Sequence, residues 1–240
     1  MKNTGTLYAD ILKAKWGKKK LLAILLDPDK IDWKNMRTLV WAICASPATH
    51  VFIGGSLVLT NKIDELAFAI KHECKLPVLL FPGNPSQISD EADGILFLSL
   101  LSGRNPDFLI GHQVAAAQTL KKSNLEIIPT GYLLIESGTK TAVEKVSKTA
   151  PMPIDNIENI AATAMAGEML GNKLIYLEAG SGAKNAVPIN IIQQVAQNIQ
   201  IPLIVGGGIT SNQAIEDAYK AGANLVVIGT AFENNINFFK

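Results

Sequence analysis

Apolar residues in this chain are concentrated in short runs, which are separated by longer segments with amphipathic spacing. The runs are almost continuously apolar rather than alternating, as expected of strands that are covered on both faces. They predict eight strands, at residues 21–26, 50–53, 78–81, 95–98, 125–131, 174–177, 202–205 and 224–228.

The segments between most of these runs have the spacing of amphipathic helices. The helices are expected at residues 33–44, 62–74, 108–121, 157–170, 189–199 and 212–221. Alternation of strand and helix predicts an α/β fold with a parallel sheet. The 240 residues are close to the roughly 250 of a typical (β/α)8 TIM barrel. We therefore predict a single TIM-barrel domain over residues 1–240.

Two units depart from regular alternation. Residues 82–91 are short and broken by proline, so the third β/α unit is expected to be irregular and to lack a full helix. Residues 138–150 form an extra helix-like segment after the fifth strand. Insertions after barrel strands usually build the active-site rim, so this segment is either a lid or a passive insert.

The composition predicts a compact protein with a large buried core, because 48% of the residues are hydrophobic and 18% are charged. A net charge of +1 and an aromatic content of 6% argue against nucleic-acid binding. A cluster of basic residues precedes the first strand, and we interpret it as a solvated surface patch rather than as a contact for a membrane or a polyanion. It consists of Lys13, Lys15, Lys18, Lys19 and Lys20.

Cys44 and Cys74 lie in separate helix-like segments, with no second cysteine or histidine at ligand spacing. They are predicted to be buried, reduced thiols of a cytosolic protein. The N-terminal segment lacks the apolar core of a signal peptide, and no apolar run reaches the roughly 18 residues of a membrane span. We therefore expect a cytoplasmic protein without a transmembrane segment.

Two glycine turns close the last two predicted strands. Gly206, Gly207 and Gly208 follow the seventh strand, while Gly229 and Thr230 follow the eighth. In (β/α)8 barrels these two loops and a helix N-terminus bring backbone N–H donors together on a phosphate. Glycine permits the close approach and the positive φ that such a turn needs. The ligand is therefore predicted to carry phosphate.

The first two strands are also followed by polar residues. Asp27 emerges directly from the first strand, and Ser56 follows the second. Mg²⁺ is usually bound by one or two protein oxygens together with substrate phosphates and water. Asp27 and Ser56 are therefore candidate metal ligands, whereas Asp29 and Lys30 are equally well explained by a turn and helix start.

Tyr176 and Glu178 alternate on the sixth strand and so project to the same side. In the barrel interior, this pair would hold and deprotonate a hydroxyl beside an anion site. Lys184 is an alternative partner for Glu178. His50, His72 and His112 are more readily explained as structural or solvated residues, and no P-loop, GxGxxG or Ser-His-Asp order is present.

The motifs DPDK, GGS, YLEAGSGA, VGGGI and the final GT resemble those of the geranylgeranylglyceryl phosphate synthase family, and their order spans essentially the whole chain. The resemblance implies a transferase of phospholipid biosynthesis that joins sn-glycerol 1-phosphate to a prenyl diphosphate. It favours a geranylgeranyl donor, whose tail would run in a groove between helices. It also implies a dimer or hexamer, in line with the high apolar content.

The same resemblance implies roles for individual residues. Asp27 and Ser56 would bind Mg²⁺, which stabilises the departing diphosphate while the glycerol C3 hydroxyl attacks. Glu178 would accept the hydroxyl proton, and Tyr176 would orient the alcohol. Glycerol phosphate contacts are implied for Tyr176, Leu177, Glu178, Ala179, Gly180, Ser181, Gly182, Gly207, Gly208, Gly229 and Thr230.

One position departs from the family pattern. Some members carry a lysine two residues before the first aspartate of the DPD motif, whereas this chain has Leu25. This places the chain in the other branch of the family and requires another cation, or more backbone donors, at the phosphate.

Two alternative functions are weighed. A sugar-phosphate isomerase of the histidine or tryptophan pathway type would need a second acid or base from the fifth strand, where Tyr132 and Glu136 occur but no aspartate. A non-catalytic phosphate-binding barrel would bind glycerol phosphate without metal-dependent turnover.

Overall fold

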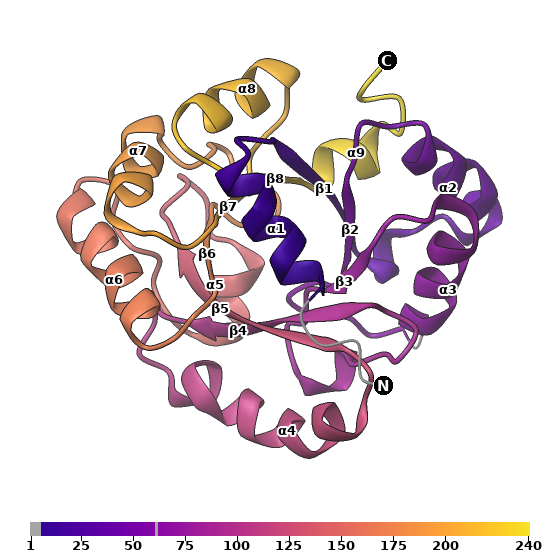
Figure 1. The fold of residues 1–240 in the computed structure, drawn as a ribbon, viewed down its shortest axis with the longest axis horizontal. Helices are drawn as coiled ribbons and strands as arrows, with labels where there is room; N and C mark the ends of the chain where they lie inside the picture. The colour runs from indigo at the N-terminus through magenta and orange to yellow at the C-terminus, as the bar shows by residue number, and fades with distance from the viewer. Residues whose placement is uncertain (1–5, 61) are drawn as a thin grey trace.

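The computed structural model describes residues 6–60 and 62–240, so residues 1–5 and 61 of the predicted domain lie outside the described part. Within it, parallel strands form a closed barrel in chain order, surrounded by helices (Figure 1). The strands are β1 (Leu21–Leu26), β2 (His50–Ile53), β3 (Val78–Leu80), β4 (Gly94–Leu100), β5 (Glu126–Leu134), β6 (Leu174–Glu178), β7 (Leu203–Gly206) and β8 (Leu225–Ile228).

The barrel confirms the predicted fold class. β8 pairs in parallel with β1, from Leu21 opposite Leu225 to Ile24 opposite Ile228, and this pairing closes the cylinder. The strand bounds follow the apolar runs, and β4 and β5 extend further than predicted. Their full register, from Gly94 opposite Glu126 to Leu100 opposite Tyr132, makes this the longest strand pair of the barrel.

Helices occupy the predicted amphipathic segments. A short helix lies within the extra segment 138–150, and further helices begin at Thr6 and at Thr230. Short 3-10 turns η1 (Pro28–Lys30) and η2 (Trp33–Asn35) and the π-helical turn η4 (Asp107–Gly111) lie between a strand and a helix, and the 3-10 turn η3 (Pro85–Gln87) lies between β3 and β4. The helices are α1 (Thr6–Trp16), α2 (Met36–Cys44), α3 (Ile63–Cys74), α4 (His112–Lys122), α5 (Ala142–Ser147), α6 (Ile157–Met169), α7 (Ile189–Asn198), α8 (Asn212–Lys220) and α9 (Thr230–Asn234).

The core has two layers because alternate strand residues point inside and outside the barrel. Leu174 and Tyr176 belong to the inner layer, whereas Ile175 and Leu177 pack between the barrel and the helices. Both layers exclude solvent. This explains why the strands are continuous apolar runs rather than alternating ones.

Helix α1 crosses the N-terminal end of the barrel (Figure 1). Its Ile11 is fully buried in the inner layer. The backbone N–H groups of Leu7 and Tyr8 donate to the Glu126 carboxylate at 2.7 and 2.9 Å. Lys15 of the basic cluster donates to the Ile201 carbonyl at 2.9 Å, so this lysine contributes a structural contact.

The third β/α unit is irregular, as predicted. Only the short turn η3 follows β3, with Asn84 as its N-cap through a bond from the Ser86 N–H. A full helix is therefore missing on this side of the barrel. The extra segment after β5 contains α5, which Thr141 and Glu144 stabilise as a capping box.

The cysteine prediction was wrong. Cys44 and Cys74 lie at the ends of α2 and α3 and form a disulfide, with their Cα atoms 5.0 Å apart. Cys44 is exposed and Cys74 is half-buried, so neither is a buried thiol. Helical spacing does not reveal that two neighbouring helices end side by side. In the described residues, no helix combines the length and apolarity needed to cross a membrane.

Candidate functional site

Polar residues from separate units of the chain meet at the C-terminal rim of the barrel. Asp27 follows β1, Ser56 follows β2, Glu178 ends β6, and Gly206 ends β7. Gly229 follows β8. All strands are parallel, so their carboxyl ends share one rim and bring these residues to the same opening.

Glu178 is the buried carboxylate of this rim. Its side chain faces the barrel interior and the residue is 5% exposed. Its Oε1 accepts a hydrogen bond from the Gly180 N–H at 2.6 Å. Burial raises the pKa of Glu178 to about 7, although the Gly180 N–H and the nearby Tyr176 hydroxyl lower it. Among the described residues, no ion pair neutralises this carboxylate, and Lys184 does not pair with it. Such a group exchanges a proton near neutral pH.

Tyr176 lies beside Glu178 in the same inward row. A Cβ on Gly206 would collide with the Tyr176 hydroxyl and lie 3.1 Å from Glu178 Oε2, so the two groups meet beneath the end of β7. Burial and the Glu178 charge raise the pKa of Tyr176, which therefore stays protonated. In the described chain the hydroxyl has no hydrogen bond of ordinary geometry, although it is near enough to Glu178 to influence its pKa.

The glycines after β7 have the backbone that the sequence predicts. Gly207 and Gly208 have φ of +78° and +67°. A Cβ on Gly207 would collide with the Glu178 carboxylate and lie 2.6 Å from the Gly180 nitrogen. Gly207 therefore lets the β7 turn pack directly on the β6 loop.

The β6 segment divides its residues between the rim and the outer layer. The side chains of Leu177 and Ala179 are fully buried between barrel and helices, and the Ala179 N–H donates to the Gly206 carbonyl at 3.0 Å. These two predicted contact residues therefore point away from the opening. Ser181 and Gly182 lie in the exposed loop beyond them.

The turn after β8 leads into α9, which begins at Thr230. The N–H groups of a first helical turn lack partners within the helix and carry partial positive charge. From the same helix, Glu233 Oε1 accepts the Asp27 N–H at 3.0 Å. The β8 turn and the β1 loop are thereby tied together at the rim.

Asp27 and Ser56 offer oxygens that fit Mg²⁺. Asp27 Oδ1 accepts the Asp29 N–H at 3.1 Å, and a Cβ on Gly55 would lie 3.1 Å from Asp27 Oδ2, so the β2 loop borders this carboxylate. In the described chain no three acidic, histidine or cysteine side chains cluster as a metal site. One carboxylate and one hydroxyl suit a cation that shares its other positions with phosphate and water.

Two residues that hold these loops have structural roles. Asp29 accepts the N–H groups of Leu59 and Thr60 at 2.8 and 2.9 Å, which explains it as a loop brace. Gln87 is 1% exposed, and its side chain bonds Gly55 through both the N–H and the carbonyl. Sequence reasoning missed Gln87, which the helix-free third unit supplies.

An aromatic cluster of Phe81, Tyr132 and Tyr176 lies under the opening. The ring centroids of Phe81 and Tyr176 are 5.2 Å apart, and those of Tyr132 and Tyr176 are 5.4 Å apart. These residues come from β5, β6 and the end of β3, so no local motif links them. The cluster packs beside Glu178, and Phe81 and Tyr132 also line an adjacent groove.

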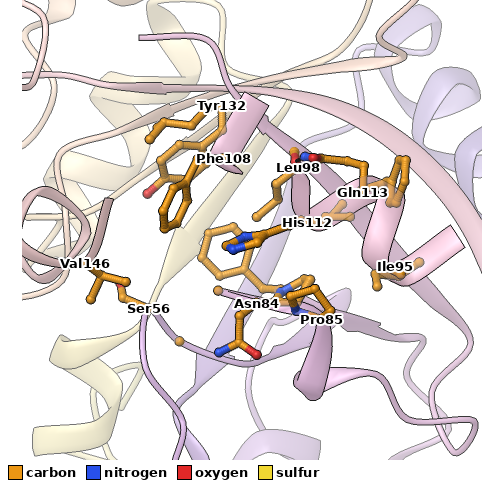
Figure 2. A pocket seen from close by; sticks show the side chains of 18 of the residues that line it. Ser56, Asn84, Pro85, Ile95, Leu98, Phe108, His112, Gln113, Tyr132 and Val146 are labelled. Carbon is orange, nitrogen blue, oxygen red and sulfur yellow. Dashed lines mark hydrogen bonds between the residues drawn. The ribbon is translucent and has the colours of Figure 1, made fainter. Parts of the chain in front are cut away.

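An apolar groove starts at this cluster and runs between β4 and α4. It holds about 800 Å³ of space, part of it open to solvent. Figure 2 shows Phe108, Tyr132 and Val146 around the same space as Ser56. The groove is lined by the loop that replaces the third helix, so the missing helix leaves room for it.

The segment after β5 forms one wall of this groove, through Val143 and Val146 of α5. The segment therefore borders the groove, and movement as a lid stays a prediction. His112 also lines the groove, against Phe108 at a centroid distance of 4.6 Å. His50 is structural, since burial lowers its pKa to about 4, and His72 is exposed beside Glu73.

Comparison with known proteins gives concordant matches. A model of the PcrB family matches residues 14–239. The chain is 61% identical to a geranylgeranylglyceryl phosphate synthase from Flavobacterium johnsoniae, over 98% of this chain and 96% of that protein. It is 51% identical to one from Zunongwangia profunda, over 93% and 95%.

A solved structure is similar over nearly the whole chain. The (S)-3-O-geranylgeranylglyceryl phosphate synthase from Thermoplasma acidophilum, in complex with its substrate sn-glycerol-1-phosphate, superposes with a TM-score of 0.91. Its sequence identity is 33%, and the match covers 98% of this chain and 94% of that one.

Proposed function

This chain belongs to the PcrB family, and we propose that it is a prenyltransferase that joins the C3 hydroxyl of sn-glycerol 1-phosphate to a prenyl diphosphate. The observation that carries the proposal is the buried Glu178, which has no ion-pair partner in the described chain and a pKa of about 7, beside the glycine turns after β6 and β7. A geranylgeranyl donor is proposed from the names of the relatives.

The phosphate of the acceptor is proposed to lie among the turns after β6, β7 and β8. Gly180, Gly207 and Gly229 bring backbone to this place, and the first turn of α9 adds unpaired N–H donors. The glycerol hydroxyls then extend toward Tyr176 and Glu178. The bound ligand of the Thermoplasma acidophilum relative supports this acceptor.

Mg²⁺ is proposed as the cofactor, with Asp27 and Ser56 as its protein ligands. These residues suit the ion because the Asp27 carboxylate is 17% exposed and is bordered by the β2 loop, which carries Ser56. When bound, the ion supplies positive charge to the diphosphate oxygens of the donor.

In the proposed step, the glycerol C3 oxygen forms a bond to the allylic carbon of the donor, and the bond from that carbon to the diphosphate oxygen breaks. Diphosphate leaves with the bonding electron pair. The hydroxyl proton passes to a Glu178 oxygen, and Tyr176, which stays protonated, holds the alcohol. The products are the ether and diphosphate.

The prenyl tail is proposed to occupy the apolar groove. Breaking the allylic bond builds positive charge on carbon, and the π faces of Phe81, Tyr132 and Tyr176 stabilise such charge. The groove leads from this cluster along α4, which suits an apolar chain whose reactive end is at the rim.

An oligomer, a dimer or a hexamer, is also proposed. Exposed apolar residues on α2 and α3 support it, since Trp41 is 69% and Phe68 is 59% exposed. Light scattering of the purified protein measures this assembly. A cytoplasmic location stays a prediction from the sequence.

The proposal is tested by incubating the protein with sn-glycerol 1-phosphate and geranyl, farnesyl or geranylgeranyl diphosphate, with and without Mg²⁺. We expect ether product and released diphosphate only when the metal is present. The enantiomer sn-glycerol 3-phosphate serves as the control acceptor. Thermal stabilisation by sn-glycerol 1-phosphate without turnover of any donor would instead support a non-catalytic phosphate barrel.

A further inference from the structure

Lys30 links three separate elements at the rim of the barrel. Its Nζ lies 3.3 Å from Ser181 Oγ, 3.4 Å from Glu233 Oε2 and 3.5 Å from Asp27 Oδ2. These partners come from the β6 loop, from α9 and from the end of β1. One ammonium therefore stands between the glycine loops of the phosphate site and the carboxylate proposed for the metal.

Stability alone does not explain this arrangement. Charge-assisted hydrogen bonds are usually about 2.7–2.9 Å long, so all three contacts of Lys30 are loose. The lysine side chain is 45% exposed, and ion pairs at that exposure contribute little to folding. The ammonium is thus loosely held and can turn toward a ligand.

The carboxylates around the opening also make a cation necessary if a phosphate is to bind there. Asp27 and Glu233 both contact Lys30, and together with Glu178 they make the rim acidic. A phosphate dianion entering this rim would be repelled by the carboxylates unless positive charge lay beside it. Lys30 brings such a charge to the β6 loop, through its contact with Ser181.

Strand β1 itself does not supply a positive charge beside the proposed phosphate. Leu25 on β1 lies next to the β8 turn, because a Cβ on Gly229 would be 3.7 Å from the Leu25 Cβ. An apolar side chain thus occupies the strand position nearest this turn. Lys30 reaches the same rim from η1, five residues further along the chain.

We propose that Lys30 is a further substrate-binding residue, whose ammonium donates to the phosphate of sn-glycerol 1-phosphate, and that Glu233 is a positioning residue for it. This inference rests on the proposed function. Glu233 is suited to the role because its Oε1 is held by the Asp27 N–H at 3.0 Å while its Oε2 faces Lys30.

The test is titration calorimetry of the full chain with sn-glycerol 1-phosphate, without metal or prenyl donor. Lys30→Met is expected to weaken binding about tenfold, the effect of losing one charge-assisted hydrogen bond at a partly exposed site. Lys30→Arg keeps the charge and is expected to bind within about threefold of wild type. Lys34→Met is the matched control, because Lys34 is an exposed lysine close by in the same loop.

Two further measurements distinguish a direct role of Lys30 in ligand binding from an effect on the fold. The salt dependence of the dissociation constant should be shallower in Lys30→Met than in wild type, because one charge contact is lost. Glu233→Gln should weaken binding in the wild-type background and have a smaller effect when Lys30 is already methionine. Equal effects of Glu233→Gln in both backgrounds would overturn its role in positioning Lys30.

Inorganic pyrophosphate with Mg²⁺ is the second ligand of the experiment. Loss of its affinity in Lys30→Met, with sn-glycerol 1-phosphate unaffected, would assign the ammonium to the donor and overturn the proposal. Unchanged affinity for both ligands would overturn it as well. If wild type itself fails to bind sn-glycerol 1-phosphate, the proposed function fails, which is a result distinct from either.

Discussion

The two sides of the barrel opening are built differently, and the ligands proposed for them would be recognised by different physical means. The side formed by β6, β7, β8 and β1 is built from glycine turns and buried polar groups, such as Gly207 packed on the Glu178 carboxylate. The side formed by β3, β4 and β5 is an apolar groove between a helix-free loop and α4. The first side is crowded, and the second is open because a helix is missing.

The difference suits the ligand that is proposed for each side. An anion is bound by N–H groups at defined positions, so its side tolerates little displacement. An apolar tail is bound by the area that it buries, which varies gradually with the size of the surrounding side chains. We therefore expect substitutions on the polar side to abolish function and those on the groove side to change preference.

The largest effect is expected for Glu178→Gln. The amide keeps the size of the side chain and cannot accept the hydroxyl proton, so kcat should fall at least about 10²-fold. Product formation from sn-glycerol 1-phosphate and geranylgeranyl diphosphate, measured at saturating substrates, checks this. Affinity for sn-glycerol 1-phosphate should change much less.

A second buried glutamate provides the control for this prediction. Glu126 is 8% exposed at the opposite end of the barrel, where it holds α1. Glu126→Gln should lower the melting temperature while kcat stays near that of wild type. Normal turnover by Glu178→Gln would remove the general base from the mechanism.

Gly207→Ala is expected to rank second. Its φ of +78° disfavours alanine, and the added methyl would collide with the Glu178 carboxylate. The β7 turn must then move away from the β6 loop, so affinity for sn-glycerol 1-phosphate should fall about 10- to 100-fold, as expected when binding groups are displaced by about 1 Å. Calorimetry measures this loss.

Gly171→Ala is the control that distinguishes a steric collision from backbone strain as the cause of weaker binding in Gly207→Ala. Gly171 has a φ of +96°, and a Cβ there would meet no atom within 4 Å. Gly171→Ala should therefore destabilise the fold without affecting binding. If both variants bound sn-glycerol 1-phosphate as tightly as wild type, the turn after β7 would not be the phosphate site.

On the groove side, Ala116→Phe is expected to change the choice of donor. Ala116 of α4 lines the groove and is 7% exposed, so a larger side chain there fills the space that is proposed for the tail. The ratio of kcat/KM for geranylgeranyl over farnesyl diphosphate should fall about tenfold, within the range for contacts of a few methylenes. Affinity for sn-glycerol 1-phosphate should not change.

The neighbouring residue on α4 is the control. Ala115 is exposed, so Ala115→Phe adds the same side chain outside the groove. It should leave the donor preference as in wild type. A preference unchanged in Ala116→Phe would show that the tail lies elsewhere.

The same contrast explains how much could be predicted from the sequence. Asp27, Glu178 and the glycine turns are recognisable because each directly follows an apolar run, and β/α alternation then places them at one rim. The eight strands are predicted for the same reason, since burial on both faces makes each run continuous.

What could not be predicted depends on contacts between distant segments. Phe81, Tyr132 and Tyr176 form a cluster only when β3, β5 and β6 close into the barrel. Lys30 and Gln87 look like ordinary loop residues, and their partners lie in other loops. The pairing of two cysteines at helix ends, and the placement of α1 beneath the barrel, are likewise tertiary outcomes.

The smallest expected effect is the pH dependence, which tests whether the buried carboxylate belongs to the polar side as a working base. Burial raises the pKa of Glu178 to about 7, so wild-type kcat should fall about twofold between pH 8 and pH 7 and about tenfold between pH 8 and pH 6.

Because this pKa lies above the ordinary value of 4.5, the folded state binds a proton more tightly than the unfolded chain. The free energy of unfolding contributed by Glu178 is therefore lost as the pH rises from about 4.5 through about 7, and Glu178→Gln should lack this loss in urea unfolding series. A kcat that is flat from pH 8 to pH 6, with equal pH dependence of stability in both proteins, would contradict the assignment.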